Sequence, residues 1–278
     1  MNKTTWLITG ASSGLGRALA EHVLKQGDQV VLAARSLESM QTLATAFPDT
    51  ALALSLDVVN PAQRASVIEQ TEKHFGSIDF LVNNAGIDFI GAVEEQEEAD
   101  YRKIFEVNFF GAVALLRLAL PGMRARRKGT IVNMSSMDGI ASFAVNGYYS
   151  ASKFALEGIT EALWQEIEPL GLRAVLIEPG SFRTGIDART KFSGEQIYDY
   201  EATSGLFRKA MENVGDEMFP GDPALAARVI YEVLKSNRKL HRIIIGSDAY
   251  KNIGGKLTAL RADYETNDAW AHSTDFKK

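Results

Sequence analysis

Tyr149 and Lys153 lie four residues apart, a spacing that predicts a phenol and an ammonium group on one face of a helix. The ordinary pKa of a phenol, about 10, makes tyrosine a poor acid or base at neutral pH. A fixed positive charge nearby stabilises the phenolate and lowers that pKa. We therefore expect Tyr149 to exchange a proton with a carbonyl or alcohol oxygen. The pair alone is also typical of a solvated helix face, so the interpretation depends on motifs elsewhere.

A glycine motif near the N-terminus follows the first predicted strand and opens the first predicted helix. Its spacing is Gly-x-x-x-Gly-x-Gly: Gly10 permits a tight turn, Gly14 lets the backbone approach a pyrophosphate, and Gly16 lets the helix pack close to the sheet. The helix N-terminus presents N–H groups and a positive dipole end to phosphate. The motif predicts a dinucleotide site, although a glycine-rich turn without a ligand has the same pattern.

The end of the second predicted strand indicates which dinucleotide binds. NAD enzymes of this architecture place a carboxylate there, whereas this chain has Ala34, Arg35 and Ser36. Arg35 can donate a forked pair of hydrogen bonds to a 2′-phosphate, and Ser13 can add a hydroxyl donor. We therefore predict NADP(H), with NAD the less favoured cofactor. The alternative for Arg35 is a surface arginine at a helix start.

Asp57 and Val58 follow the third predicted strand. The carboxylate of Asp57 is placed to accept a hydrogen bond from an adenine amino group. Asp57 could equally start the helix that follows Asn60 and Pro61, so both readings stay open.

The composition bounds the function classes. The 278 residues are 46% hydrophobic, carry a net charge of −5 and include no cysteine, which excludes disulfides and thiol chemistry and fits a reducing compartment. The four histidines have no metal-ligand spacing, and the one short basic run, 124–128, fits a solvated helix end. We predict no metal, no nucleic-acid partner and no membrane span. The apolar run 6–8 is too short for a signal peptide, so we expect a cytoplasmic protein.

Short apolar, β-rich runs alternate with amphipathic stretches along most of the chain. Nearly continuous apolar strands separated by helices predict a doubly wound α/β fold, a parallel sheet of about seven strands with helices on both faces. The predicted strands are Thr5–Thr9, Gln29–Ala34, Ala51–Leu56, Phe80–Asn83, Gly129–Met134, Leu172–Glu178 and Arg242–Ile245. The predicted helices are Gly14–Gln26, Leu37–Ala46, Pro61–Phe75, Tyr101–Arg126, Tyr149–Leu170 and Ala227–Lys235.

No Pro-, Gly- or Ser-rich linker divides the chain, so we predict a single domain over 1–278. Residues from about 181 to 220 are polar and aromatic with weak periodicity, which is typical of a lid over a binding site. Residues from about 247 to 278 form a C-terminal tail.

Taken together, these motifs resemble those of the short-chain dehydrogenase/reductase (SDR) family, and the resemblance extends from about Thr4 to Ile245. The ordered set is far more specific than any one motif. It comprises, in chain order, Thr9-Gly10-x-x-x-Gly14-x-Gly16, Asn83-Asn84-Ala85-Gly86, Asn108, Ser135-Ser136, Tyr149 with Lys153, and Pro179-Gly180 with Thr184. The tail adds a similarity to the hydroxysteroid-dehydrogenase-like subgroup, which does not establish a steroid substrate.

Two motif positions have close rivals. Tyr148 neighbours Tyr149 but points about 100° away around the helix, so it is expected to line the substrate wall or an interface. Ser135 and Ser136 face opposite sides of a strand end. The thirteen-residue distance from Ser136 to Tyr149 matches the family pattern, so we favour Ser136.

The resemblance implies reversible interconversion of a carbonyl and an alcohol. It implies that Tyr149 donates the proton, Lys153 lowers its pKa and binds the nicotinamide ribose, Ser136 holds the substrate oxygen, and Asn108 holds a relay water. The implied cofactor site comprises Gly10, Ser12, Ser13, Gly14, Leu15, Gly16, Arg35, Asp57, Val58, Asn84, Ala85, Gly86, Tyr149, Lys153, Pro179, Gly180, Phe182 and Thr184.

The aromatic residues of the lid suggest a bulky hydrophobic or aromatic small-molecule substrate, or packing of the lid on its own domain. The resemblance also implies a homodimer or homotetramer, formed through the helices at 101–126 and 149–170. Two alternatives are an NADP-sensing regulator with little turnover and an SDR epimerase or dehydratase. The first is disfavoured because Tyr149 and Lys153 are both present, the second because no larger C-terminal substrate domain is evident.

Overall fold

The computed structural model describes residues 3–185, 191–212, 215, 218–236 and 238–276. Its centre is one seven-stranded parallel sheet with the order β3-β2-β1-β4-β6-β7-β9. The strands are β1 (Thr5–Thr9), β2 (Gln29–Ala34), β3 (Ala51–Ser55), β4 (Phe80–Asn83), β6 (Thr130–Met134), β7 (Arg173–Pro179) and β9 (Arg242–Ile245). The predicted doubly wound fold is confirmed, and each predicted strand end lies within one residue of the observed end.

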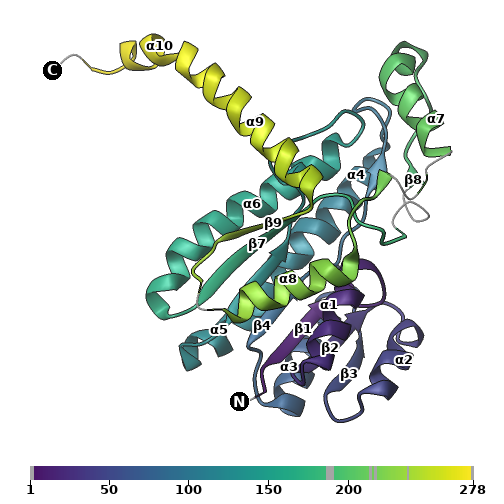
Figure 1. The fold of residues 1–278 in the computed structure, drawn as a ribbon, viewed down its shortest axis with the longest axis vertical. Coiled ribbons are helices and arrows are strands. Elements are labelled where there is room, and N and C mark those ends of the chain that lie inside the picture. The colour runs from purple at the N-terminus through teal and green to yellow at the C-terminus, as the bar shows by residue number, and fades with distance from the viewer. Residues whose placement is uncertain (1–2, 186–190, 213–214, 216–217, 237, 277–278) are drawn as a thin grey trace.

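Helices cover both faces of the sheet (Figure 1). One apolar cluster joins the sheet to α1 (Gly14–Lys25), α2 (Glu38–Ala46) and α8 (Pro223–Lys235). A second cluster joins the opposite face to α3 (Pro61–Phe75), α5 (Ala112–Arg126) and α6 (Gly147–Ile167). Because both faces are buried, the strands are apolar throughout rather than alternating, as the sequence pattern predicted.

The start of α3 resolves one of the open readings. The side chain of Asn60 accepts hydrogen bonds from the N–H groups of Ala62 and Gln63, at 3.0 and 3.1 Å, and Pro61 occupies the first turn. Asn60 is therefore the cap of this helix, and Asp57 lies outside it.

The helix predicted at 101–126 begins earlier and is interrupted. It consists of α4 (Glu98–Phe105), a π-helical turn η1 (Glu106–Gly111) and α5. A π-helical turn inside an α-helix is rare and is frequent at functional sites. This turn carries Asn108.

The same stretch, Glu98–Arg126, is long and apolar enough to cross a membrane by length and composition, contrary to our prediction that no segment is. Part of its apolar surface is used inside the protein: Leu115, Leu116 and Met123 are buried in the second cluster. Burial against the sheet therefore accounts for part of the apolar composition of this stretch.

Several elements were not predicted. They are β5 (Phe89–Ile90), β8 (Lys191–Phe192), α7 (Leu206–Glu212), α9 (Ser247–Thr266) and α10 (Asp268–Ser273), with short turns at Met137–Gly139, Glu168–Leu170, Tyr198–Tyr200 and Glu201–Gly205. The predicted tail is thus largely helical, and α9 extends away from the body of the protein (Figure 1). Strands β5 and β8 form a separate two-stranded parallel sheet.

Candidate active site

The predicted catalytic residues come from three places in the fold that meet beyond the carboxyl ends of the central strands. Ser136 follows β6, Asn108 lies in the π-helical turn, and Tyr149 and Lys153 lie in the first two turns of α6. The crevice outside the carboxyl ends of parallel strands is where ligands bind in folds of this class.

Lys153 is held against the end of β6. Its side chain is buried, and Nζ donates a hydrogen bond to the carbonyl oxygen of Met134 at 2.8 Å. Nζ lies 5.5 Å from the centroid of the Tyr149 ring. Burial lowers the pKa of Lys153 to about 8, against the opposing charges of Glu157, Asp138 and Asp88. The lysine can therefore change its protonation state near neutral pH.

Tyr149 shares a hydrogen bond with the Ser136 side chain. We expected Lys153 to lower the pKa of Tyr149, and this expectation is wrong, because the pKa is raised. Burial raises the pKa of Tyr149, and the charges of Asp138 and Asp88 raise it further, while the bond to Ser136 opposes the change. The phenol is consequently held in its protonated form at neutral pH.

The two adjacent serines lie in different surroundings. The hydroxyl of Ser136 accepts a hydrogen bond from the Asp138 N–H at 3.1 Å and is the one that contacts Tyr149. The hydroxyl of Ser135 lies instead beside Glu157, on the other side of the strand end. The structure therefore brings Ser136, and not Ser135, together with the tyrosine.

The side-chain amide of Asn108 is hydrogen-bonded mainly to the backbone of Ile87. Its Oδ1 accepts from the Ile87 N–H at 2.8 Å, and its Nδ2 donates to the Ile87 carbonyl at 2.9 Å and to Ser152 Oγ at 3.2 Å. This clamp fixes the chain immediately before Asp88 and ties it to α6. The relay-water role that we predicted for Asn108 stays a prediction.

Two carboxyl groups that our sequence reasoning missed lie beside these residues. Asp138 is buried and accepts a hydrogen bond from Asn146 Nδ2, while one oxygen of Asp88 is buried with no hydrogen-bond partner. Burial raises the pKa of Asp88 to about 7, aided by the charge of Asp138. Burial also raises the pKa of Asp138 to about 6, opposed by Asn146 and Lys153. The sequence did contain a signal for these two carboxylates. Asp88 lies two residues after the motif that ends at Gly86, and Asp138 lies two residues after Ser136.

The glycine loop has the backbone geometry that its spacing predicted. Gly10 and Gly14 have φ of +67° and +59°, which L side chains rarely adopt. A Cβ atom on Gly16 would lie 2.3 Å from Asn84 Nδ2 and 2.7 Å from the Gly10 carbonyl oxygen, so only glycine fits this approach. Ser12, Ser13 and Leu15 are half-buried around the start of α1.

Thr9 and Asn84 tie this loop to the end of β4. Thr9 Oγ1 accepts from the N–H groups of Asn84 and Ala85 at 2.9 and 3.0 Å, and Asn84 Nδ2 donates to the Thr9 carbonyl at 2.9 Å. Asn84, predicted to shape the cofactor site, therefore fixes the loop itself. Gly86 lies nearby: a Cβ added there would be 3.4 Å from Asn108 Oδ1 and 3.8 Å from Lys153 Nζ.

Arg35 lies exposed just beyond the end of β2, where we predicted it. A second arginine, which our sequence reasoning missed, reaches the helix after this loop: Arg17 Nη1 donates to the carbonyl oxygen of Ser39, in the first turn of α2, at 2.9 Å. Two arginines thus contribute to the region that follows β2. Asp57 is half-buried with one oxygen accepting from the Val59 N–H at 3.1 Å, and Val58 is buried against Gly111.

The Pro179-Gly180 turn ends β7 and is fixed by α9. The Gly180 N–H donates to the Ile245 carbonyl at 2.8 Å, and the Ser181 N–H donates to Asp248 Oδ2 at 2.7 Å. Phe182, predicted in the cofactor site, has its ring buried in the apolar core beside Gly221. Thr184 follows in the chain segment just before the residues that the structure does not describe, 186–190.

No group of three or more metal-ligating side chains occurs among the residues that the structure describes. The residues present fit a dinucleotide: the glycine loop admits close backbone approach at the N-terminus of α1, and its cap residue makes no side-chain cap bond.

Comparison with known proteins agrees with this arrangement. The family described as short chain dehydrogenase matches residues 4–193. "Oxidoreductase calM" of Penicillium decumbens is 34% identical over 94% of this chain and 90% of its own length. A short-chain dehydrogenase from Streptomyces avermitilis is 39% identical, with a TM-score of 0.92 over 99% of each chain. A Burkholderia phymatum SDR structure in complex with NAD has a TM-score of 0.78 at 24% identity, over 100% of this chain and 98% of its own. This chain belongs to the short-chain dehydrogenase/reductase family of oxidoreductases.

Proposed function

We propose that this protein is an NADP(H)-dependent reductase that converts a bulky hydrophobic or aromatic carbonyl compound to an alcohol, reversibly. The observation that carries the proposal is the contact of the Tyr149 hydroxyl with Ser136, beside the buried ammonium of Lys153. A bound nicotinamide would supply the hydride.

The residues then have separable tasks. Ser136 and Tyr149 would both hydrogen-bond the substrate oxygen and stabilise the negative charge that develops on it. Tyr149 would donate its proton to that oxygen. Because its pKa is raised, the phenol is protonated at neutral pH, which is the form that carbonyl reduction requires. Lys153, with a pKa of about 8, would return a proton to Tyr149.

The preference for NADP rests on charge at the end of β2. Arg35 follows β2 where the 2′-phosphate would bind, Arg17 reaches the first turn of α2, and Glu38 is the nearest acidic residue after the strand in the sequence. Guanidinium groups bind phosphate through paired hydrogen bonds. We further propose that the protein is one domain with a lid and that it is cytoplasmic, the latter because a chain without cysteine fits a reducing compartment. We also propose a homo-oligomer, because the central helices expose the apolar side chains of Phe110, Leu118, Phe154 and Ile159.

The decisive experiment is oxidation of NADPH and of NADH, followed at 340 nm, against aryl ketones, aldehydes, diketones and steroids. We expect turnover with at least one hydrophobic carbonyl compound, faster with NADPH. Tight NADPH binding without turnover across the panel would instead favour a cofactor-sensing regulator.

A further inference from the structure

The segment 191–212, called the lid segment below, docks on a loop that precedes α4. Strand β8 pairs in parallel with β5, and the Ser193 N–H continues the pairing to the Ile90 carbonyl oxygen at 2.9 Å. Ser193 is buried; its hydroxyl accepts from the Glu97 N–H at 2.9 Å and donates to Asp100 Oδ2 at 2.8 Å. The first residues of the lid segment are therefore fixed to residues 89–100.

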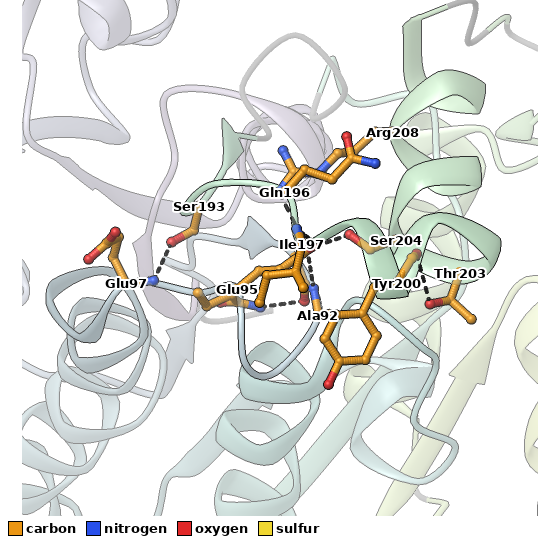
Figure 2. A network of polar contacts seen from close by, with 12 residues as sticks. Ala92, Glu95, Glu97, Ser193, Gln196, Ile197, Tyr200, Thr203, Ser204 and Arg208 are labelled. Carbon is orange, nitrogen blue, oxygen red and sulfur yellow. Dashed lines mark hydrogen bonds and ion pairs between the residues drawn. The ribbon is translucent and has the colours of Figure 1, made fainter.

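Glu95 is the centre of this contact (Figure 2). Its side chain is 0% exposed, and its carboxylate is satisfied from both sides. Oε1 accepts from the Ile197 N–H at 3.0 Å, and Oε2 accepts from the Ala92 N–H at 2.9 Å. The Ser204 hydroxyl also donates to Oε2, and Arg208 Nη2 lies 3.5 Å from it.

These contacts keep the carboxylate charged. Burial acts to raise the pKa of Glu95, but hydrogen bonds from Ser204, Ile197 and Ala92 and the charge of Arg208 outweigh it, so the pKa is lowered. Hydrogen bonds to an ionised group are roughly twice as strong as neutral ones. Leaving such a carboxylate buried without its donors would be costly. Three of the four donors belong to the lid segment. Separating the lid segment from the loop would therefore leave the Glu95 carboxylate without most of its hydrogen-bond donors.

The loop that carries Glu95 also contacts the start of the catalytic helix. The Gly91 N–H donates to the Val145 carbonyl at 3.0 Å, and the Tyr148 hydroxyl donates to the Val93 carbonyl at 3.4 Å. Val145 has φ of +66°, a strained conformation for a β-branched residue, and it lies four residues before Tyr149. The loop 91–97 thus connects the lid segment to the backbone that positions the phenol.

We propose that Glu95 is a positioning residue that fixes the lid segment beside the start of α6, and that it thereby determines the affinity for a bulky apolar carbonyl substrate. This inference rests on the proposed function for its substrate. The lid segment carries aromatic side chains, and the ring of Phe192 lies under the Arg208 guanidinium at 4.6 Å, so the position of Arg208 also fixes an apolar surface. The glycine loop and the end of β2, where we propose that the cofactor binds, are separate elements, so we expect cofactor binding not to depend on Glu95.

The test compares Glu95→Gln with Glu94→Gln. Glutamine has nearly the same shape, but it loses the charge and presents an NH2 group to donors. Glu94 is the matched control, because it is exposed and accepts a hydrogen bond from the Tyr200 hydroxyl of the same segment, at 2.7 Å. Limited trypsin digestion reports docking directly through cleavage after Arg208 and Lys209. We expect cleavage about tenfold faster in Glu95→Gln and within about twofold of wild type in Glu94→Gln.

Steady-state kinetics give the second readout. We expect the KM for a carbonyl substrate to rise about tenfold in Glu95→Gln, with kcat within about threefold and the Kd for NADPH unchanged. Ser204→Ala, which removes one donor only, should give a smaller change in the same direction and serves if Glu95→Gln does not fold. Glu95→Asp, which restores the charge, should recover part of the affinity.

Unchanged cleavage and unchanged KM in both Glu95→Gln and Ser204→Ala would overturn the inference, even if the melting temperature fell. If wild-type protein reduces no carbonyl compound, the proposed function fails, whereas the digestion experiment still decides whether Glu95 holds the lid segment.

Discussion

Lys153 donates its hydrogen bond to the backbone carbonyl of Met134 at 2.8 Å, so the ammonium group is fixed by the strand end that also presents Ser136. Tyr149 lies one helical turn before Lys153 in α6. The end of β6 therefore helps to set the distance between Ser136 and Tyr149. A backbone acceptor cannot be removed by side-chain substitution, so this relation is a property of the fold.

Tyr149→Phe removes the proposed proton donor and keeps the ring. We expect turnover to fall at least about 100-fold, because general acid catalysis contributes roughly that much or more. The Kd for NADPH, measured by fluorescence titration, should stay within about twofold. Tyr148→Phe tests the rival tyrosine, whose ring stacks on Tyr101 at 4.3 Å, and should retain over about a tenth of the activity. Full activity of Tyr149→Phe would refute the assignment.

Arg35→Ala removes one of the two guanidinium groups in the region that follows β2. We expect the Kd for NADPH to rise about tenfold, or about 1.4 kcal/mol, with less than a twofold change for NADH. Arg17→Ala should act in the same direction with a smaller effect, because this arginine already donates to Ser39. Calorimetric titration with both cofactors checks the prediction, and equal losses for NADPH and NADH would exclude a 2′-phosphate site here.

Asp88→Asn tests the carboxyl group whose pKa burial raises. The pKa of Asp88 is raised from 3.8 to about 7, so the folded protein binds the proton more tightly than the unfolded chain. Stability is therefore lost as pH rises from about 4 through 7, and the asparagine variant escapes this loss. We expect the variant to gain about 2–3 kcal/mol, or roughly 5–10 °C in Tm, relative to wild type on going from pH 5 to pH 8.

The exposed Asp49→Asn change is the control for that experiment, and its Tm difference from wild type should be similar at the two pH values. If Asp88→Asn behaves in the same way, the buried and partnerless carboxyl oxygen of Asp88 has no energetic consequence.

Arg242→Met tests the cluster of charged side chains between α6, β7 and β9. Arg242 pairs with Glu157 and Glu161 of α6 and with Glu178 of β7, and Glu157 and Glu178 are buried. Removing the arginine leaves these two carboxylates without their cation, which we expect to cost about 3 kcal/mol of unfolding free energy. Arg102→Met, which breaks an exposed pair with Glu98, should leave the unfolding free energy nearly unchanged, because water screens this pair. Urea denaturation measures the unfolding free energy of both variants. Equal losses of unfolding free energy in the two variants would contradict the prediction.

The sequence by itself determined the sheet and the glycine loop after β1. The strands were predicted to within one residue because each is a local apolar run buried on both faces, and Gly10, Gly14 and Gly16 were identified because their spacing follows from backbone sterics alone. Elements that lack such a local pattern were missed. Strands β5 and β8 have two residues each and are defined only by pairing with each other.

Only the tertiary structure decided the electrostatics of the site. Spacing placed Lys153 beside Tyr149, yet the pKa of the phenol follows from burial and from Asp88 and Asp138, which reach it from other segments. The same holds for Glu95, whose partner Ser204 lies 109 residues away in the chain. The physical reason is that desolvation and charge act through space, so these effects exist only once distant segments have been brought together.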